Sequence, residues 1–404
     1  MARDAESASC ADVQVMKLMT SDPEGGPMAM GSQRHLFDMP DEVAYFNTAN
    51  MSPLLTSVRE AGEAGLARRG APWRIGSADW FTDVELLRAA FADLVGTDPD
   101  SIALVPATSY GLAIAARNLT AAPGDRVILL ADEYPSNYYT WQRFCRRTGA
   151  ELAIVGREPG QSWAEAITSA IDDRAHIVSV PNVHWTNGGL VDLDAVAPAA
   201  RSVGATLVID ASQSLGAMPL DIARLQPDFV VTVGYKWLLG PFGVGFLYVS
   251  ERCRGGVPLE ENWINRQGSD DFAALVQYSD GYRPGARRFD VGQRTNFGLV
   301  PMSLAAFKQL RRWTVAGVGE SLRVVTSTIR ERAQALGFTT PPNLEHGPHM
   351  LGLDVPQEQA IALADRLAAQ GVVASVRGTS MRIAPHLHTT QSDVDRLLAA
   401  LGYV

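Results

Sequence analysis

Lys236 is the residue with the clearest capacity for covalent chemistry. It follows an apolar run, 228–234, and precedes a tryptophan and two leucines. A lysine in a partly apolar pocket has a lowered pKa, and its neutral amine forms a Schiff base with an aldehyde. Asp210 ends another apolar run, 206–210, where a buried carboxylate can keep a heterocyclic nitrogen protonated. The pair therefore predicts a site for an aldehyde carried on a nitrogen heterocycle.

Two other segments supply groups for a phosphate and for a flat ring. Thr108 and Ser109 follow the run 101–107 and open a helical pattern, whose N-terminal N–H groups and dipole favour phosphate. Tyr134 follows the run 125–132, and its aromatic ring can stack on a flat ligand. Phosphate, ring nitrogen, aldehyde and ring face together describe pyridoxal 5′-phosphate (PLP), so we predict that the chain binds this cofactor.

These residues follow short apolar runs that alternate with helix-sized segments. The runs, rich in Val, Ile and Leu, are 101–107, 125–132, 151–156, 176–181, 206–212 and 228–234. Uniformly apolar strands separated by helices indicate a largely parallel sheet that is buried on both faces. Ligands bind beyond the carboxyl ends of the strands in such a sheet, which is where the candidate residues lie.

The pattern changes after about residue 297. The segment 302–318 is typical of one long helix, and further helices and two or three short strands follow it. We therefore expect an α/β protein in three parts. These are an N-terminal arm (1–44), a large PLP-binding domain with a mostly parallel seven-stranded sheet flanked by helices (45–300), and a small C-terminal α+β domain (301–404).

Composition excludes several classes of partner. The 404 residues include 35 Lys and Arg against 44 Asp and Glu, a net charge of −9, which argues against a nucleic-acid surface. The sequence has no apolar stretch near the roughly 20 residues of a membrane span and no signal-peptide pattern, so we expect a cytoplasmic protein. The pairs His346/His349 and His386/His388 lack carboxylate or cysteine companions, so we expect no metal site.

Seven segments, in order along the chain, resemble the class V aminotransferase family of fold type I PLP-dependent enzymes. That family includes cysteine desulfurases, kynureninase and isopenicillin N epimerase. The segments are YFNTANMSPL (45–54), PATSYGL (106–112), DEYPSN (132–137), VIDASQSLG (208–216), VGYKWLLGPFGVGFLYV (233–249), RRFDVGQRTNF (287–297) and MRIAPHLHTT (381–390). They span nearly the whole chain after residue 45.

The resemblance implies a cofactor role for nine residues at these strand ends. Lys236 would hold PLP and move protons at the substrate Cα, and Asp210 would pair with the pyridine nitrogen. Thr295 is similar to a residue that a second subunit lends to the phosphate, which implies a homodimer. The other six would contact the phosphate (Thr108, Ser109, Tyr235), the ring face (Tyr134), the ring hydroxyl (Gln213), and the ring or substrate (Asn182).

The resemblance also implies that Arg382 clamps the α-carboxylate of an amino-acid substrate, a bidentate task for which arginine is suited. Arg377 lies close in sequence and could share or take over this task. His184 is a candidate acid or base of the substrate pocket, and the alternative is a loop histidine with its hydrogen bonds satisfied. Thr108 and Ser109 could simply cap the helix that follows, and we expect them to do so while also binding phosphate.

The sequence indicates the type of reaction less closely than it indicates the cofactor. Cysteine desulfurases need a mobile-loop cysteine in the C-terminal domain, whereas this chain has no cysteine after Cys253 and offers Ser380 there. We therefore expect a C–S lyase that acts by β-elimination on an S-substituted cysteine, with an aminotransferase as the nearest alternative. An epimerase, a decarboxylation-coupled deaminase and a non-catalytic PLP-binding protein also remain open.

Overall fold

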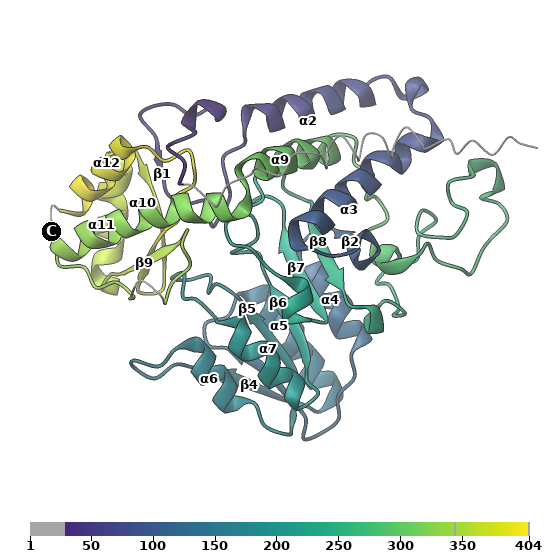
Figure 1. The fold of residues 1–404 in the computed structure, drawn as a ribbon, viewed down its shortest axis with the longest axis horizontal. Helices are drawn as coiled ribbons and strands as arrows, with labels where there is room; N and C mark the ends of the chain where they lie inside the picture. Colours follow the sequence, from purple (N-terminus) through teal and green to yellow (C-terminus); the bar gives the residue numbers. More distant parts are fainter. Residues whose placement is uncertain (1–28, 343–344, 403–404) are drawn as a thin grey trace, which may run out of the picture.

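A seven-stranded sheet forms the centre of the computed structural model, which describes residues 29–342 and 345–402 (Figure 1). Strand β8 runs antiparallel to both of its neighbours, and the other pairings in the sheet are parallel. This confirms the predicted mostly parallel seven-stranded sheet. The spatial order is β2 (Ile102–Val105), β8 (Gly245–Val249), β7 (Phe229–Val233), β6 (Thr206–Asp210), β5 (Ala175–Pro181), β3 (Arg126–Leu130) and β4 (Glu151–Val155).

Helices cover both faces of the sheet, which explains why its strands are apolar without alternation. On β3, Val127 and Leu129 pack into one core cluster while Ile128 and Leu130 pack into another. Helices α4 and α5 contribute to the first cluster, and α3, α6 and α7 contribute to the second. The helices are α3 (Thr82–Val95), α4 (Thr108–Asn118), α5 (Pro135–Thr148), α6 (Trp163–Ala170), α7 (Leu193–Ser202) and α8 (Ile222–Leu225).

The C-terminal part combines long helices with a small sheet of order β11-β12-β9 (Figure 1). β1 (Ala44–Tyr45) pairs with β10, so the start of the described chain contacts this part. The elements are α9 (Leu299–Trp313), α10 (Val315–Ala335), β9 (Leu351–Asp354), α11 (Ala360–Ala369), β10 (Val372–Val373), β11 (Ser375–Arg377), β12 (Ser380–Ile383) and α12 (Gln391–Leu401). The predicted divisions at residues 44 and 300 stay predictions, and residues 1–28 of the predicted arm lie outside the described residues.

The prediction of one long helix over 302–318 is wrong, because the chain forms α9 and α10 with a break at Thr314. This residue has a positive φ of 58°, and its side chain accepts a hydrogen bond from the Gly317 N–H at 3.0 Å. It therefore caps α10 and turns the chain between the two helices. Helix α2 (Thr56–Arg69) lies along α9, where the carbonyl of Phe297 leaves no room for a Cβ at Gly65.

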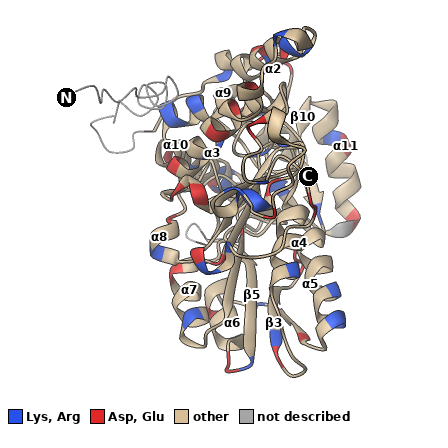
Figure 2. Cartoon of the chain, turned by 90° about the vertical axis from the view of Figure 1, so that its right-hand side faces the viewer, with Lys and Arg blue, Asp and Glu red and all other residues tan. Residues whose placement is uncertain are grey.

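Short 3-10 turns connect these elements, and the charges on the outer helices are mixed in sign. Figure 2 shows basic residues on helix α5 and both acidic and basic residues on helix α7 in that view. Among the helices that the structure describes, none is long and apolar enough to cross a membrane. The 3-10 turns are Arg34–Leu36, Pro72–Arg74, Ser77–Trp80, Pro99–Ser101, Glu251–Cys253, Phe272–Ala274, Gly285–Phe289 and Gln357–Gln359.

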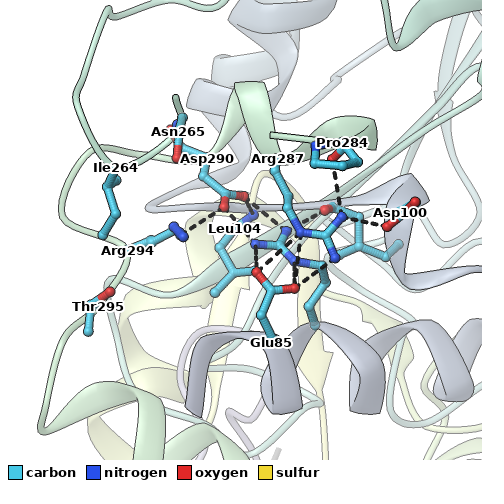
Figure 3. A network of polar contacts seen from close by, with 12 residues as sticks. Glu85, Asp100, Leu104, Ile264, Asn265, Pro284, Arg287, Asp290, Arg294 and Thr295 are labelled. Carbon is cyan, nitrogen blue, oxygen red and sulfur yellow. Dashed lines mark hydrogen bonds and ion pairs between the residues drawn. The ribbon is translucent and has the colours of Figure 1, made fainter. Parts of the chain in front are cut away.

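A buried ion-pair network fastens the segment 285–295 to helix α3 and to the edge strand β2 (Figure 3). Arg88 Nη2 lies 2.6 Å from Asp290 Oδ2, and Asp290 Oδ1 accepts a hydrogen bond from the Leu104 N–H at 2.7 Å. Glu85 pairs with Arg287 at 2.8 Å. The network therefore joins two regions about 200 positions apart in the sequence.

Candidate active site

A cavity of about 210 Å³ lies at the carboxyl ends of the parallel strands. Because β2, β3, β5, β6 and β7 all end at the same edge, segments far apart in the sequence meet there. The cavity contains seven of the eleven predicted site residues. Its lining is Pro106, Ala107, Thr108, Ser109, Glu133, Tyr134, Ser136, Pro181, Val183, Trp185, Asp210, Ser212, Gln213, Val233, Tyr235, Lys236 and Phe242.

Lys236 follows β7 and is buried, with 7% of its surface exposed. Its Nζ lies 5.5 Å from the centre of the Tyr134 ring and 5.9 Å from that of Tyr235. Burial lowers the pKa of Lys236 to about 8; the positive charge of Arg382 acts in the same direction and Asp210 opposes it. At neutral to mildly alkaline pH this amine is therefore available in its neutral, nucleophilic form.

Asp210 ends β6 and faces the same cavity. Its Oδ1 accepts a hydrogen bond from the Ser212 N–H at 2.9 Å, and burial raises its pKa above the usual value. The hydrogen bonds from Ser212 and the charge of Lys236 oppose this rise. A buried carboxylate in this position is stabilised by a cationic N–H group in the cavity, which is what a protonated pyridine nitrogen supplies.

The first turn of α4 also lines the cavity. The helix begins after Ala107 without a side-chain cap, so Thr108 and Ser109 do not cap it as the alternative interpretation proposed. Instead, Thr108 Oγ1 lies 2.8 Å from Ser212 Oγ. An uncapped helix N-terminus that opens on a cavity is a favourable place for a phosphate.

Gln213 is held against the floor of the cavity by two partners. Its Nε2 donates to the Ala49 carbonyl at 3.0 Å, and its Oε1 accepts from the Trp237 Nε1–H at 3.1 Å. The amine, carboxylate, uncapped helix and aromatic rings thus surround one volume, and this donor set fits PLP. The observation that decides the fit is the buried pair of Lys236 and Asp210 in a cavity bounded by the uncapped α4 terminus.

Arg382 lies on β12, outside the cavity lining but in contact with it. Its Nη1 donates to the carbonyl of Trp185, a lining residue, at 2.8 Å, and its Nη2 lies 3.4 Å from Asn47 Oδ1. The side chain is buried, its Nε has no hydrogen-bond partner, and no carboxylate of the described chain pairs with it. Burial, together with the charge of Arg377, lowers the pKa of Arg382 to about 10.

Three other predicted residues lie outside the cavity lining. Asn182 follows β5 between two lining residues, and its buried Oδ1 has no partner. His184 contacts the Ala131 carbonyl through Nε2 at 3.0 Å and Thr186 Oγ1 through Nδ1 at 2.7 Å. Thr295 donates to the Trp80 carbonyl at 2.6 Å. The predicted roles of these residues stay predictions, and the contacts of His184 are those of a satisfied loop histidine.

Sequence reasoning did not single out Trp185 and Glu133. The Trp185 ring meets Tyr134 edge-on at 5.5 Å, and its Nε1 donates to the Asp132 carbonyl at 2.7 Å. Glu133 is buried with one oxygen unpartnered, and burial together with Asp210 raises its pKa to about 8. Glu133 directly follows the run 125–132 and Trp185 follows His184, so the strand-end rule could have found both residues.

Within residues 29–342 and 345–402, no three or more His, Cys, Asp or Glu side chains gather as metal ligands. The two cysteines that the structure describes, Cys145 and Cys253, lie outside the cavity lining, and Cys10 falls in the part that is not described. The sulfur chemistry of any substrate would therefore meet no thiol from the described lining.

The chain is similar to known proteins over most of its length. A family model described as aminotransferase class-V matches residues 76–397. An uncharacterized aminotransferase of Bacillus subtilis (strain 168), YcbU, is 27% identical over 335 residues, covering 81% of this chain and 85% of the relative. Isopenicillin N epimerase of Streptomyces clavuligerus is 29% identical over 337 residues, covering 78% and 82%.

The fold is similar to that of C-DES. A structure of its K223A mutant, with glycine linked covalently to the PLP cofactor, superposes with a TM-score of 0.83 at 21% identity. The alignment covers 92% of this chain and 99% of that one. Another structure describes C-DES as a cystine C–S lyase in complex with its product, cysteine persulfide. At this identity the likeness shows the fold.

Proposed function

The chain belongs to the aminotransferase class-V family, and from that premise we propose that it is a C–S lyase that cleaves S-substituted cysteines by β-elimination. The predicted family and the prediction of a PLP-dependent enzyme are confirmed. The observation that carries the proposal is the buried amine of Lys236 beside Asp210, with the unpaired guanidinium of Arg382 behind Trp185. This arrangement suits proton removal from the Cα of an amino acid whose carboxylate is held.

Residues of the site can be assigned to substrate binding and to removal of the Cα proton. Arg382 binds the α-carboxylate, and this ion pair neutralises a charge that is buried without a carboxylate partner. Lys236 Nζ then removes the Cα proton, a task that its lowered pKa permits near neutral pH. When bound, PLP supplies an electron sink for the pair left on Cα, and Asp210 keeps that sink strong by holding the ring nitrogen protonated.

Departure of the sulfur group accounts for the remaining electrons and protons of the β-elimination. The Cβ–S bond breaks, the sulfur leaves with the electron pair, and a proton converts the thiolate to a thiol. Addition of water to the released three-carbon fragment gives pyruvate and ammonium. No redox partner is needed, and no cysteine of the described cavity lining is available to accept sulfur.

Aminotransfer is the second candidate function, and the name of the B. subtilis relative favours it. In that reaction Lys236 would return the proton to a different carbon and no C–S bond would break. Epimerisation, the activity named for the S. clavuligerus relative, needs a second acid on the opposite face of Cα. The described lining offers Glu133, whose pKa of about 8 leaves it largely protonated at neutral pH.

We also propose that the enzyme is a homodimer in which Thr295 reaches the phosphate of the partner subunit. Thr295 and the network residue Asp290 lie on the same segment, 285–295, which the buried ion pairs fasten (Figure 3). A fixed segment of this kind suits a contact across an interface. Sedimentation of the PLP-loaded protein tests the proposal, and a monomer at micromolar concentration would contradict it.

The reaction is tested by mixing the PLP-loaded enzyme with S-alkyl-L-cysteines and following pyruvate and free thiol. We expect both products in equal amounts, with loss of both in Lys236→Ala. Transfer of the amino group to an added 2-oxo acid without thiol release would instead establish an aminotransferase. Exchange of the Cα proton with inversion, again without thiol, would establish an epimerase.

A further inference from the structure

Arg377 is a second arginine beside the site that the proposed reaction leaves without a task. It ends β11, and in the β11-β12 hairpin it lies opposite Ser380, two residues before Arg382. Its guanidinium carbon lies 6.0 Å from the centre of the Trp185 ring. Since the Trp185 carbonyl accepts a hydrogen bond from Arg382, one tryptophan contacts both arginines.

Trp185 is held firmly between the cavity and Arg377. Its indole N–H donates to the Asp132 carbonyl at 2.7 Å, and its ring meets Tyr134 edge-on at 5.5 Å. Tyr134 and Trp185 both line the cavity. Contacts therefore link Tyr134 through Trp185 to the half-buried Arg377, which places this arginine next to a residue of the cavity wall.

Arg377 and Arg382 are two positive charges close to the cavity. Arg377 donates to the Val376 carbonyl at 2.8 Å, but in the described part of the chain no carboxylate lies at ion-pair distance from Arg377 or Arg382. The charge of Arg377 lowers the pKa of both Lys236 and Arg382, so it acts on the same volume. A single α-carboxylate can neutralise one of these two arginines and leaves the other unpaired.

We propose that Arg377 binds a second carboxylate, at the far end of the substrate side chain. The inference rests on the proposed function, in which Arg382 takes the α-carboxylate. It makes Arg377 a specificity-determining residue, and it names the substrate class as S-substituted cysteines whose sulfur substituent ends in a carboxylate. An arginine suits this position because its planar fork binds a carboxylate through two hydrogen bonds.

Binding alone tests the proposal, independently of the reaction. L-2-aminoadipate and L-norleucine share a chain length and differ in the terminal carboxylate, and each is titrated into the PLP-loaded enzyme while its visible spectrum is followed. We expect the dicarboxylate to bind about tenfold more tightly, a preference that Arg377→Gln abolishes and Arg377→Glu reverses in favour of L-lysine. Equal affinities in the wild-type enzyme would overturn the proposal.

Arg147→Gln is the matched control, because Arg147 also makes one 2.8 Å hydrogen bond to a carbonyl, that of Ala116, and lies 5.4 Å from a ring centre, that of Phe144. It lies on α5 outside the cavity lining and should leave the tenfold preference intact. If Arg377→Gln weakened both ligands equally, Arg377 would share the α-carboxylate with Arg382, and the second site would be refuted.

Kinetics separate this proposal from the proposed function. S-(2-carboxyethyl)-L-cysteine and S-propyl-L-cysteine are compared by thiol release, and we expect the ratio of their kcat/KM values to fall about tenfold in Arg377→Gln. If neither thioether is cleaved while the binding preference persists, the lyase assignment fails and the second carboxylate site stands. If both thioethers are cleaved with equal kcat/KM, the lyase assignment stands and the second carboxylate site is refuted.

Discussion

Two regions of the molecule bury arginine in opposite ways. In the network between α3 and segment 285–295, Arg88 is fully buried and pairs with Asp290 at 2.6 Å and with Glu85 at 3.2 Å. Beside the cavity, Arg382 is almost as deeply buried but contacts a carbonyl and an amide oxygen and, among residues 29–342 and 345–402, no carboxylate. Arg88 therefore has its ion-pair partners within the chain, whereas Arg382 can take a carboxylate partner from a ligand.

The pKa values of Glu85, Lys236 and Arg382 follow this difference, whereas burial lowers the pKa of the network residue Arg294 to about 10 as well. In the network, the arginines hold the pKa of Glu85 at about 2 despite its burial. At the cavity, burial dominates and lowers the pKa of Lys236 to about 8 and that of Arg382 to about 10. A buried charge without a partner is costly, so it persists where a ligand supplies the missing charge. Arg88 and Glu85, which are paired, build the fold here, and Lys236 and Arg382 mark the site.

Replacing Lys236 should separate function from stability most sharply. We expect Lys236→Ala to lower turnover at least about 1000-fold, because the amine both holds the cofactor and moves the Cα proton. Its unfolding midpoint in urea, measured on the cofactor-free protein, should not fall, since the substitution removes a costly buried amine. The exposed Lys308, changed to Ala, is the control and should alter neither quantity.

Substitutions in the ion-pair network between α3 and segment 285–295 should lower the stability of the protein, unlike Lys236→Ala. Asp290→Ala leaves Arg88 buried beside a single carboxylate, and we expect a loss of about 3–5 kcal/mol in the free energy of unfolding. Asp395→Ala breaks an exposed pair with Arg332 at 2.6 Å and should change stability far less. Urea titration of both variants measures the contrast, and similar losses would mean that burial does not distinguish these pairs.

As the pH falls, the protein should lose stability first through its buried histidines. It should lose stability through the ion-pair network of Glu85 and Arg88 only at lower pH. Burial lowers the pKa of His349 and of His388 from 6.5 to about 4, so the folded protein keeps them neutral while the unfolded chain binds protons. Stability therefore falls as pH decreases from about 6.5 to 4. The contribution of Glu85 has the usual carboxylate sense: it is complete above 4.5 and is lost as pH falls towards 2.

The pH dependence of the urea midpoint measures this order. His388→Gln, which cannot titrate, should flatten the slope between pH 6.5 and 4 by about one proton while leaving the slope below pH 4 unchanged. A slope in the upper range that is the same in the variant and the wild type would assign the protons to other groups.

Removing the cofactor should have the smallest effect on stability, and this effect should arise at the cavity alone. Because PLP binds the folded state alone, its loss should lower the melting temperature by several degrees through linkage. The shift should depend on PLP concentration in the wild type and in Arg88-network variants alike. A cofactor-free protein that melts at the same temperature as the loaded one would contradict a tightly built site.

Much of the site was predictable because parallel strands deliver their last residues to one edge. Lys236, Asp210, Thr108 and Tyr134 each follow a strand that its Val- and Ile-rich pattern reveals, so strand assignment alone placed them together. The break at Thr314 was not predictable, because the helical pattern runs on through it and only a positive φ and a local cap end the helix.

The sequence by itself determined the strands that follow its apolar runs, the order of the candidate residues and the chemistry that they share, since side-chain type and period depend on local sequence. Only the tertiary structure decided which charges are paired. Asp290 lies 202 positions from Arg88, and Arg382 lies 197 from Trp185, yet one contact completes a network and the other leaves a guanidinium open to a ligand. Burial and pairing depend on such long-range contacts, which no local pattern encodes.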